Sequence, residues 1–424
     1  MFSRLLQNIS WLAVDRVIRL FGELFIGIWV ARYLGPKDYG VLNYAIAFSG
    51  LFLLFVKLGL DQIIVRELVK KPKLRNYLLG TAFYLKLIGA IIAIALISLS
   101  LVLIETDGLI KAIILIISLG FIFQAVDVVD YFYQAKISSK KIAISRSIAF
   151  VVSLIFKVVF IINDFSVIYF AVAVLVEAFL VSILLLFVYI NDSNLFSQWR
   201  FSNKIAIGLL KASWPLAISI FLISVHMKID QVMIGNLLDS EHVGIYAVAV
   251  KLSEAWYFIP AIIIMTLTPY FVDLRERNYN LYNARLIQLY SFMFWLGILV
   301  GVLFLFIGQQ LVILLYGQSY EESYVALVIN IWNGIFISQA LARGIWLISE
   351  DLQKYRLYNN LIIVFVNIIA NLLLIPRFGI AGAAIATFLT QSIGTWGVSF
   401  IWKPLRKSTW AMMKSVNPLY LIRS

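Results

Sequence analysis

The sequence has no cysteine and few charged residues, and both shortages restrict what the chain can be. Without cysteine, disulfides, thiolate metal sites and thiol redox chemistry are excluded. Since His226 and His242 are the only histidines, we expect no histidine metal site and no cofactor. Charged residues make up 13% of the 424, whereas about 25% is typical of globular proteins. With 62% hydrophobic residues, the composition predicts a polytopic membrane protein.

Apolar runs of membrane-spanning length follow one another along the whole chain. They predict an all-α protein with twelve transmembrane helices. The first is interrupted by charges and lacks a small-residue cleavage site, so we expect it to be retained and not cleaved as a signal peptide. The predicted spans are residues 9–33, 41–62, 78–104, 110–133, 142–162, 166–190, 206–235, 243–271, 285–307, 322–348, 356–375 and 379–402.

Lysine and arginine are distributed unequally between the two sets of connecting loops. One set carries nearly all of them, including Arg146, and the other carries only Arg32, Lys37, Lys111 and Arg377. Because positively charged loops stay in the cytoplasm, both termini are predicted to be cytoplasmic. The net charge of +13 then reflects membrane topology, and we expect no nucleic-acid partner.

The chain contains a weak internal repeat. Residues 34–41 align without gaps with residues 238–245, and residues 155–157 align with 369–371. Six spans per half return the chain to the same side, which predicts two pseudo-symmetric lobes related by an axis normal to the membrane. The predicted parts are an N-terminal lobe at 1–190, a linker at 191–205, a C-terminal lobe at 206–402 and a basic cytoplasmic tail at 403–424.

The first predicted span carries four ionisable residues, Asp15, Arg16, Arg19 and Glu23. At 100° per residue they occupy one arc roughly 100° wide. A charge at the bilayer centre costs about 2.5 to 3.5 kcal/mol on insertion scales, so such a stripe should face partners or a water-filled cavity. The sequence therefore predicts that this helix lines a polar passage.

A motif after the first span resembles a known family. The run Ala31-Arg-Tyr-Leu-Gly-Pro-Lys-Asp-Tyr-Gly40 is followed by Leu58-Gly-Leu-Asp61, Val65-Arg-Glu-Leu68 and, in span 7, Trp214-Pro215. These residues resemble the polysaccharide-exporter branch of the MOP superfamily, and within it the Wzx-type O-antigen flippases. The resemblance covers the whole chain.

The resemblance implies a MATE-like fold and a transport function without catalysis. It implies that undecaprenyl-diphosphate-linked oligosaccharide units of O-antigen or a related surface polysaccharide move across the bacterial cytoplasmic (inner) membrane by alternating access. Membrane lipids and other polysaccharide assembly proteins are the implied partners. The glycan itself is not indicated.

Ionisable and polar side chains inside the spans are the candidate contacts for such a cargo. Bases slightly outnumber acids there, which suits an anionic diphosphate. The predicted anion contacts are Arg16, Arg19, Lys57, Lys228, Lys251 and Arg343. The predicted glycan-facing residues are Asn330, Asn333, Gln339, Asn360, Asn367 and Gln391.

Because the chain has no P-loop for ATP, transport is predicted to be facilitated or coupled to an ion gradient. We expect Asp15, Glu23, Glu177 and Glu254 to be buried carboxylates that exchange a proton or sodium ion for cargo. The alternative for such charges is structural pairing, since Asp15 and Arg19 lie four residues apart. Lys86 lacks a partner on its own helix and is expected to face a cavity or the contact between the lobes. Asp127 and Asp130 are expected at the membrane interface.

Three other functions share part of this pattern. A multidrug antiporter of the same superfamily has the same architecture, but the excess of bases argues against it. Lipid II flippases generally have two further helices, whereas this chain ends shortly after span 12. A membrane glycosyltransferase or O-antigen polymerase generally needs a large outward loop, and the outward loops here are short.

Overall fold

The computed structural model describes residues 2–192, 194–352 and 354–421, and every regular element in these ranges is helical. In the first helix and at residue 354, some side chains fall outside the described set; Arg16, a predicted anion contact, is one of them. The chain divides into two compact units, unit 1 at Met1–Lys228 and unit 2 at Ile229–Ser424.

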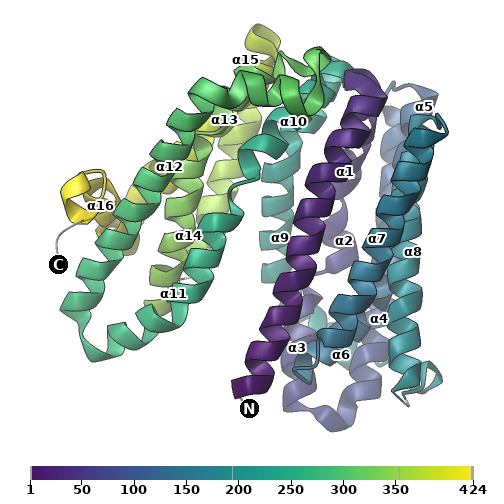
Figure 1. The fold of residues 1–424 in the computed structure, drawn as a ribbon. Helices are drawn as coiled ribbons and strands as arrows, with labels where there is room; N and C mark the ends of the chain where they lie inside the picture. The colour runs from purple at the N-terminus through teal and green to yellow at the C-terminus, as the bar shows by residue number, and fades with distance from the viewer. Residues whose placement is uncertain (1, 193, 353, 422–424) are drawn as a thin grey trace. The chain divides into compact units, whose positions relative to one another are not determined.

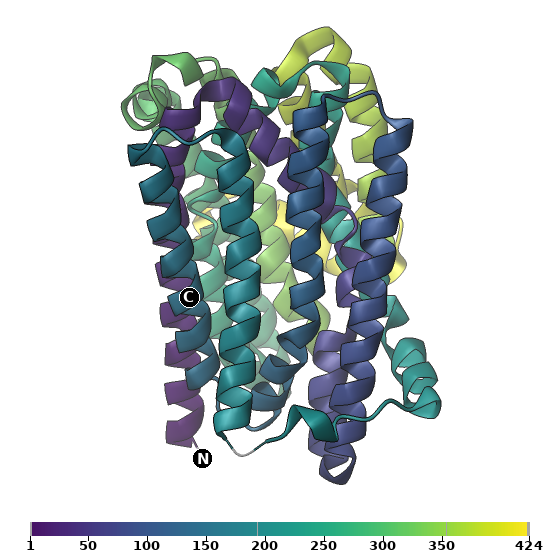
Figure 2. The same cartoon turned by 90° about the vertical axis from the view of Figure 1, so that its right-hand side faces the viewer.

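Unit 1 is a bundle of helices in which α1 packs against α7 and α5, and α8 packs against both of these (Figures 1 and 2). Apolar faces, which hold Leu60, Ile64 and Val128, form its core. Its helices are α1 Phe2–Gly50, α2 Leu53–Lys57, α3 Leu60–Lys70, α4 Arg75–Leu103, α5 Gly108–Phe123, α6 Val128–Ala135, α7 Lys140–Ile162, α8 Val167–Asn191 and the first part of α9 Asn203–Leu237.

Unit 2 takes the rest of α9 and a second set of helices, with α12 packed on α14 and α13 on α10 and α15. These helices are α10 Ser240–Glu254, α11 Phe258–Arg277, α12 Tyr279–Tyr316, α13 Ser323–Asn330, α14 Asn333–Ser349, α15 Lys354–Ser392 and α16 Arg406–Lys414.

In the described ranges, nine helical stretches are long and apolar enough to cross a membrane, or ten if a bent pair counts as one span. The stretch Tyr355–Phe400 contains two predicted spans, joined at Gly379 with a φ of 57°. The bent pair, Phe21–Gly50 with Leu53–Lys70, covers most of the first two predicted spans. The chain is a multi-pass membrane protein, and the number twelve stays a prediction.

Interruptions of the helices recur at nearly the same spacing in the two halves of the chain. Residues 51–52 separate α1 from α2, and residues 255–257 separate α10 from α11, a shift of 204 between the first residues. A 3-10 turn at Gln124–Asp127 precedes α6, and residues 331–332 precede α14. These breaks follow the repeat that the sequence predicts at 34–41 and 238–245.

The second break of the bent pair lies at Leu58 and Gly59, which have φ values of 51° and 62°. This left-handed backbone ends α2, and α3 begins at Leu60. Position 59 also touches α9, since a Cβ there would lie 2.5 Å from the nitrogen of Ala217 and 2.8 Å from the oxygen of Ser213. Only glycine combines this conformation with such a close approach of two backbones.

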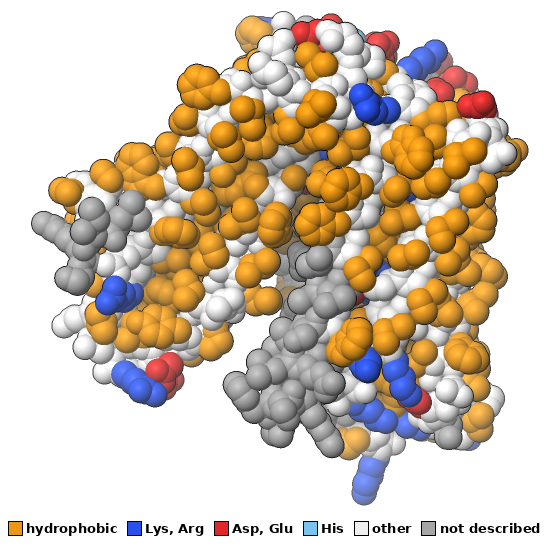
Figure 3. Space-filling view, in the orientation of Figure 1, with side chains coloured by type: hydrophobic (Ala, Val, Ile, Leu, Met, Phe, Trp, Pro, Cys, Tyr) orange, Lys and Arg blue, Asp and Glu red, His pale blue; other side chains and the backbone are white. Residues whose placement is uncertain are grey.

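Three basic loops of unit 1 lie together at one end of the bundle. The nitrogen of Arg200 donates to the carbonyl of Asn76 at 3.1 Å, and Lys141 and Tyr133 both bond to Asp192. The bond from Lys141, and then that from Tyr133, holds the pKa of the Asp192 carboxyl below its usual value. Lysines and arginines gather near α3 and α6 in Figure 3, while hydrophobic side chains cover the length of the helices.

The segment predicted as a cytoplasmic tail contains a helix, α16, that packs against unit 2. Leu405 and Met412 are buried in the same apolar cluster as Trp346. The hydroxyls of Ser408 and Tyr290 are hydrogen-bonded at 3.0 Å. A polar and an apolar set of contacts therefore fix one face of α16.

Candidate functional site

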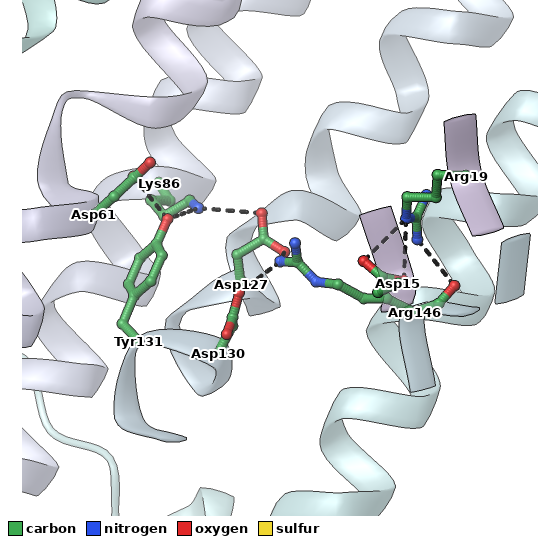
Figure 4. A network of polar contacts seen from close by, with 8 residues as sticks. All are labelled: Asp15, Arg19, Asp61, Lys86, Asp127, Asp130, Tyr131 and Arg146. Atoms are coloured by element: carbon green, nitrogen blue, oxygen red, sulfur yellow. Dashed lines mark hydrogen bonds and ion pairs between the residues drawn. The ribbon is translucent and has the colours of Figure 1, made fainter. Parts of the chain in front are cut away.

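A chain of ion pairs and hydrogen bonds crosses the interior of unit 1 (Figure 4). It connects side chains from α1, α3, α4, α6, α7 and α8 and the turn before α6. We call it the unit 1 network. Its members are Asp15, Arg19, Asp61, Lys86, Asp127, Asp130, Tyr131, Arg146 and Glu177.

The first part of the network is centred on Arg19 of α1. Its guanidinium lies 3.4 Å from the carboxylate of Asp15 and 3.1 Å from that of Glu177 on α8. It also donates to the carbonyl oxygen of Arg146 at 2.9 Å and covers the ring of Phe150 at 4.9 Å. The charged stripe of α1 thus meets partners on α7 and α8, and the predicted Asp15–Arg19 pair is confirmed.

The middle of the network is centred on Arg146 of α7, which the sequence analysis assigned to a loop. Its guanidinium lies 2.9 Å from Asp130 and 3.3 Å from Asp127. Asp130 is only 6% exposed. Both carboxylates face Arg146, and the 3-10 turn at Gln124–Asp127 leads into the helix that carries Asp130. That the two residues lie at the membrane interface stays a prediction.

The last part of the network contains Lys86 of α4, which is 1% exposed. Its ammonium group lies 3.6 Å from Asp127 and donates to the hydroxyl of Tyr131 at 3.1 Å. The same hydroxyl donates to Asp61 at 2.8 Å. Lys86 therefore has an ionic partner on another element, and Tyr131 links it to the start of α3.

Acids outnumber bases in the unit 1 network. The described network has five acids, Asp15, Asp61, Asp127, Asp130 and Glu177, and three bases, Arg19, Lys86 and Arg146, apart from the hydroxyl of Tyr131. Lys57 of α2 lies close enough to act electrostatically on Lys86, so it adds a further positive charge near the described contacts. By contrast, bases slightly outnumber acids when the ionisable residues of all predicted spans are counted.

Unit 2 contains a buried carboxylate that the sequence analysis did not select. Asp230 of α9 is 7% exposed and accepts hydrogen bonds from Tyr246 at 3.0 Å, from Asn371 at 2.7 Å and from Thr387. In the described ranges no lysine or arginine nitrogen lies within 4.0 Å of it. A neutral hydrogen-bond shell surrounds this acid.

Several amide groups of unit 2 remain unsatisfied. The side-chain oxygens of Asn333, Asn367 and Asn371 are buried and have no hydrogen-bond partner among the residues that the structure describes. The side-chain amide of Asn371 donates a hydrogen bond to Asp230. Asn367 lies one helical turn before Asn371 on α15. Oxygen atoms that lack donors beside an unpaired carboxylate are the ligand types that hard monovalent cations prefer.

Arg343 of α14 is a buried cation in unit 2 with neutral partners. It is 5% exposed and donates to the carbonyl of Thr395 at 3.1 Å and to the hydroxyls of Ser399 and Thr409. Its Nε has no hydrogen-bond partner in the described structure. Among the predicted anion contacts whose side chains the structure describes, only Arg343 is buried and has no acidic group within 4.0 Å.

The other predicted contacts occupy varied positions. Lys57 and Lys228 are half-buried and Lys251 is exposed. Among the predicted ion-coupling residues, Asp15 and Glu177 are partly buried, whereas Glu23 and Glu254 are exposed, so their predicted burial is wrong.

Most predicted glycan-facing residues are enclosed within unit 2. Asn330 and Asn333 are hydrogen-bonded to each other at 3.2 Å, and Gln339 bonds to Trp396 at 2.9 Å and Ser415 at 3.1 Å. Asn367 is fully buried, while Asn360 and Gln391 are half-buried. The structure brings Asn330 and Asn333 together, and the glycan role of the six stays a prediction.

The family model described as polysaccharide biosynthesis protein matches residues 5–275 of this chain. Over 414 residues the chain is 25% identical to the capsular polysaccharide biosynthesis protein CapF of Staphylococcus aureus, covering 94% of this chain and 99% of that protein. It is 29% identical to the probable flippase AglR of Haloferax volcanii over 182 residues, 39% of this chain and 36% of that protein.

Solved membrane proteins share the fold. The lipid II flippase MurJ, in an inward closed conformation, gives a TM-score of 0.73 with 16% identity, covering 98% of this chain and 92% of that one. An inward-facing MATE multidrug resistance transporter of the MOP superfamily gives 0.67 with 14% identity over 96% and 99%. These likenesses show a MurJ- and MATE-like fold, and the fold neighbours are a flippase and a transporter, not enzymes.

Proposed function

Because the chain belongs to the polysaccharide biosynthesis protein family, we propose that it is a flippase for a lipid-linked oligosaccharide. The cargo is an undecaprenyl-diphosphate-linked repeat unit of O-antigen or a related surface polysaccharide. It moves across the bacterial cytoplasmic membrane while the two lobes alternate in access. The family match over residues 5–275 is the observation that carries this proposal.

The names of the relatives support a glycan cargo. CapF is a capsular polysaccharide biosynthesis protein, AglR a probable flippase and MurJ a lipid II flippase. The runner-up is the multidrug antiporter, which has the same fold. A diphosphate cargo needs positive charge inside an apolar bundle, and a buried Arg343 that is bonded to neutral groups can supply it.

We assign ion coupling to both units. In unit 1 the acid excess of the network, with Asp15 and Glu177 among its members, favours a bound proton. In unit 2 the carboxylate of Asp230 and the free amide oxygens beside it favour a proton or a sodium ion. Glu23 and Glu254 are exposed and are weaker candidates than Asp230.

Genetic complementation tests the proposal. The gene is expressed in a bacterial strain that lacks its own flippase and carries the enzymes for a cognate lipid-linked glycan, and surface glycan is scored. We expect export with the wild type, loss with Arg343→Gln, and retention with Arg356→Gln, which changes an exposed arginine of α15. Membrane abundance of each variant is measured in parallel.

The result also separates the two functions. Lack of surface glycan with every cognate lipid-linked substrate supplied, together with efflux of cationic dyes by the same cells, would replace the flippase with the multidrug antiporter. Equal export by the wild type and Arg343→Gln would remove Arg343 from the cargo path and leave the flippase function intact.

A further inference from the structure

A groove on unit 2 lies outside the residues discussed for transport. It has a volume of about 380 Å³ and is formed by α12, α14 and α16. Its apolar part consists of Leu286, Ile287, Trp346 and Ala411. The remaining lining residues are Asn283, Lys407, Ser408, Trp410 and Lys414.

The two lysines give this groove a positive charge. Lys407 and Lys414 lie seven residues apart on α16 and therefore share a face. No acidic side chain lines the groove in the described structure. At the neighbouring helix ends, Glu350 and Asp273 are paired with Arg275 and Arg277 at 3.2 and 2.9 Å, so those acids do not neutralise the lysines.

The position of Lys407 is fixed. Its ammonium group donates to the hydroxyl of Tyr279 at 2.9 Å and lies 4.6 Å from the centre of that ring. Trp410, next to it on the same face, is 57% exposed and stacks edge-on against Phe400. An exposed tryptophan beside lysines is typical of a membrane–water interface.

We propose that this groove binds one anionic phospholipid of the bilayer. The headgroup phosphate lies between Lys407 and Lys414, and an acyl chain covers Leu286, Ile287 and Trp346. Basic pockets between membrane helices bind anionic headgroups. The apolar side chains of the groove can pack against a hydrocarbon chain. A zwitterionic lipid offers the same chain without the net negative charge.

The bound lipid has a structural effect through α16. Beneath the groove α16 is fixed by polar contacts: Thr409, which does not line the groove, is bonded to Arg343, and Ser408, which does, is bonded to Tyr290. A lipid that holds the outer face stabilises the packing of the inner face. Anionic lipid should therefore raise the thermal stability of the protein.

Native mass spectrometry of the purified full-length protein tests the proposal. Phosphatidylglycerol is titrated, with phosphatidylcholine of the same chains as comparison. The quantity compared is the Kd of the most tightly bound phosphatidylglycerol molecule. We expect it to be at least tenfold higher for Lys407→Gln/Lys414→Gln than for the wild type, since each lysine near an anionic group contributes about fivefold in affinity. The control Lys70→Gln/Lys73→Gln, two exposed lysines of unit 1, should keep the wild-type affinity.

Thermal unfolding gives the second readout. Phosphatidylglycerol should raise the Tm of the wild type and of the control but not that of Lys407→Gln/Lys414→Gln. If the double variant does not fold, the single variant Lys414→Gln replaces it, because this exposed lysine lies at the rim of the groove.

Three results would overturn the assignment. One is wild-type affinity for phosphatidylglycerol in the double variant, and another is an equal loss in the control. The third is displacement of phosphatidylglycerol by an equimolar polyprenyl diphosphate, which would assign the groove to cargo. The first two results do not bear on glycan export and the third would support the flippase proposal, so all three are distinguishable from its failure.

Discussion

At the scale of single residues, the interior of unit 1 depends on side chains that each serve two partners. Arg146 connects Asp127 with Asp130, and Tyr131 connects Lys86 with Asp61. Removing one such group leaves two buried partners incompletely satisfied, and each unsatisfied polar group costs about 1–3 kcal/mol. Single substitutions in the network should therefore have larger effects than the loss of one contact suggests.

Tyr131→Phe tests this statement with the smallest change. The ring remains, but Lys86 loses an acceptor and Asp61 loses a donor at 2.8 Å. We expect the free energy of unfolding to fall by about 2 kcal/mol, seen as a lower Tm in detergent. The matched control is Tyr324→Phe, whose exposed hydroxyl bonds only a backbone carbonyl in the described structure. Equal Tm values for the two variants would contradict the prediction.

Asp230→Asn tests ion coupling in unit 2. The amide keeps the size of the side chain but carries no charge, so it cannot hold a proton or a sodium ion in the same way. We expect glycan export to lose its dependence on the sodium or proton gradient, measured in cells with ionophores. Asp164→Asn, at an exposed position with a φ of 56°, should behave like the wild type. Export by Asp230→Asn that still follows the gradient would exclude this role.

At the scale of elements, the breaks in the helices position the polar residues. The 3-10 turn before α6 brings Asp127 and Asp130 inward, and the break at Leu58 and Gly59 places Asp61 in the first turn of α3. Continuous helices would carry these carboxylates to other faces. The interruptions are therefore part of the construction of the network.

Gly59→Ala tests the break between α2 and α3. Alanine at a φ of 62° is strained, and its Cβ would collide with the backbone of α9 at Ala217. We expect a drop in Tm of several degrees and reduced membrane abundance. Gly108→Ala is the control, because Gly108 has no positive φ and no described atom lies within 4 Å of an added Cβ there. An equal Tm for Gly59→Ala and Gly108→Ala would contradict the prediction.

At the scale of the whole molecule, the predicted topology can be measured with single introduced cysteines, because the sequence has no native cysteine to remove first. Single cysteines at Lys73 and Ser138, in loops at the basic end of unit 1, should stay unlabelled by an impermeant maleimide in intact cells. Single cysteines at Thr106 and Asp164, in the opposite set of loops, should be labelled. Labelling after lysis is the control for accessibility. The reverse pattern would invert the membrane orientation.

The sequence predicts the helical class, the family and most span positions, because long apolar runs and the motif around Gly35 are local signals. It does not predict that Lys86 meets Asp127 or that Asp230 lacks a cation, because these depend on contacts between helices far apart in the chain. The contacts of Asp127 and Asp130 with Arg146 have the same origin, because the 3-10 turn at Gln124–Asp127 sets the direction of these side chains.

The close approach of Gly59 to α9 also has an evolutionary consequence. The left-handed Gly59 is in close contact with the backbone at Ser213 and Ala217. A change at Gly59 therefore requires a change in α9, and the reverse also holds. In an alignment of related chains, a larger residue at position 59 should occur only where span 2 is unbroken or the start of span 7 has shifted. These positions would then co-vary although more than 150 residues separate them.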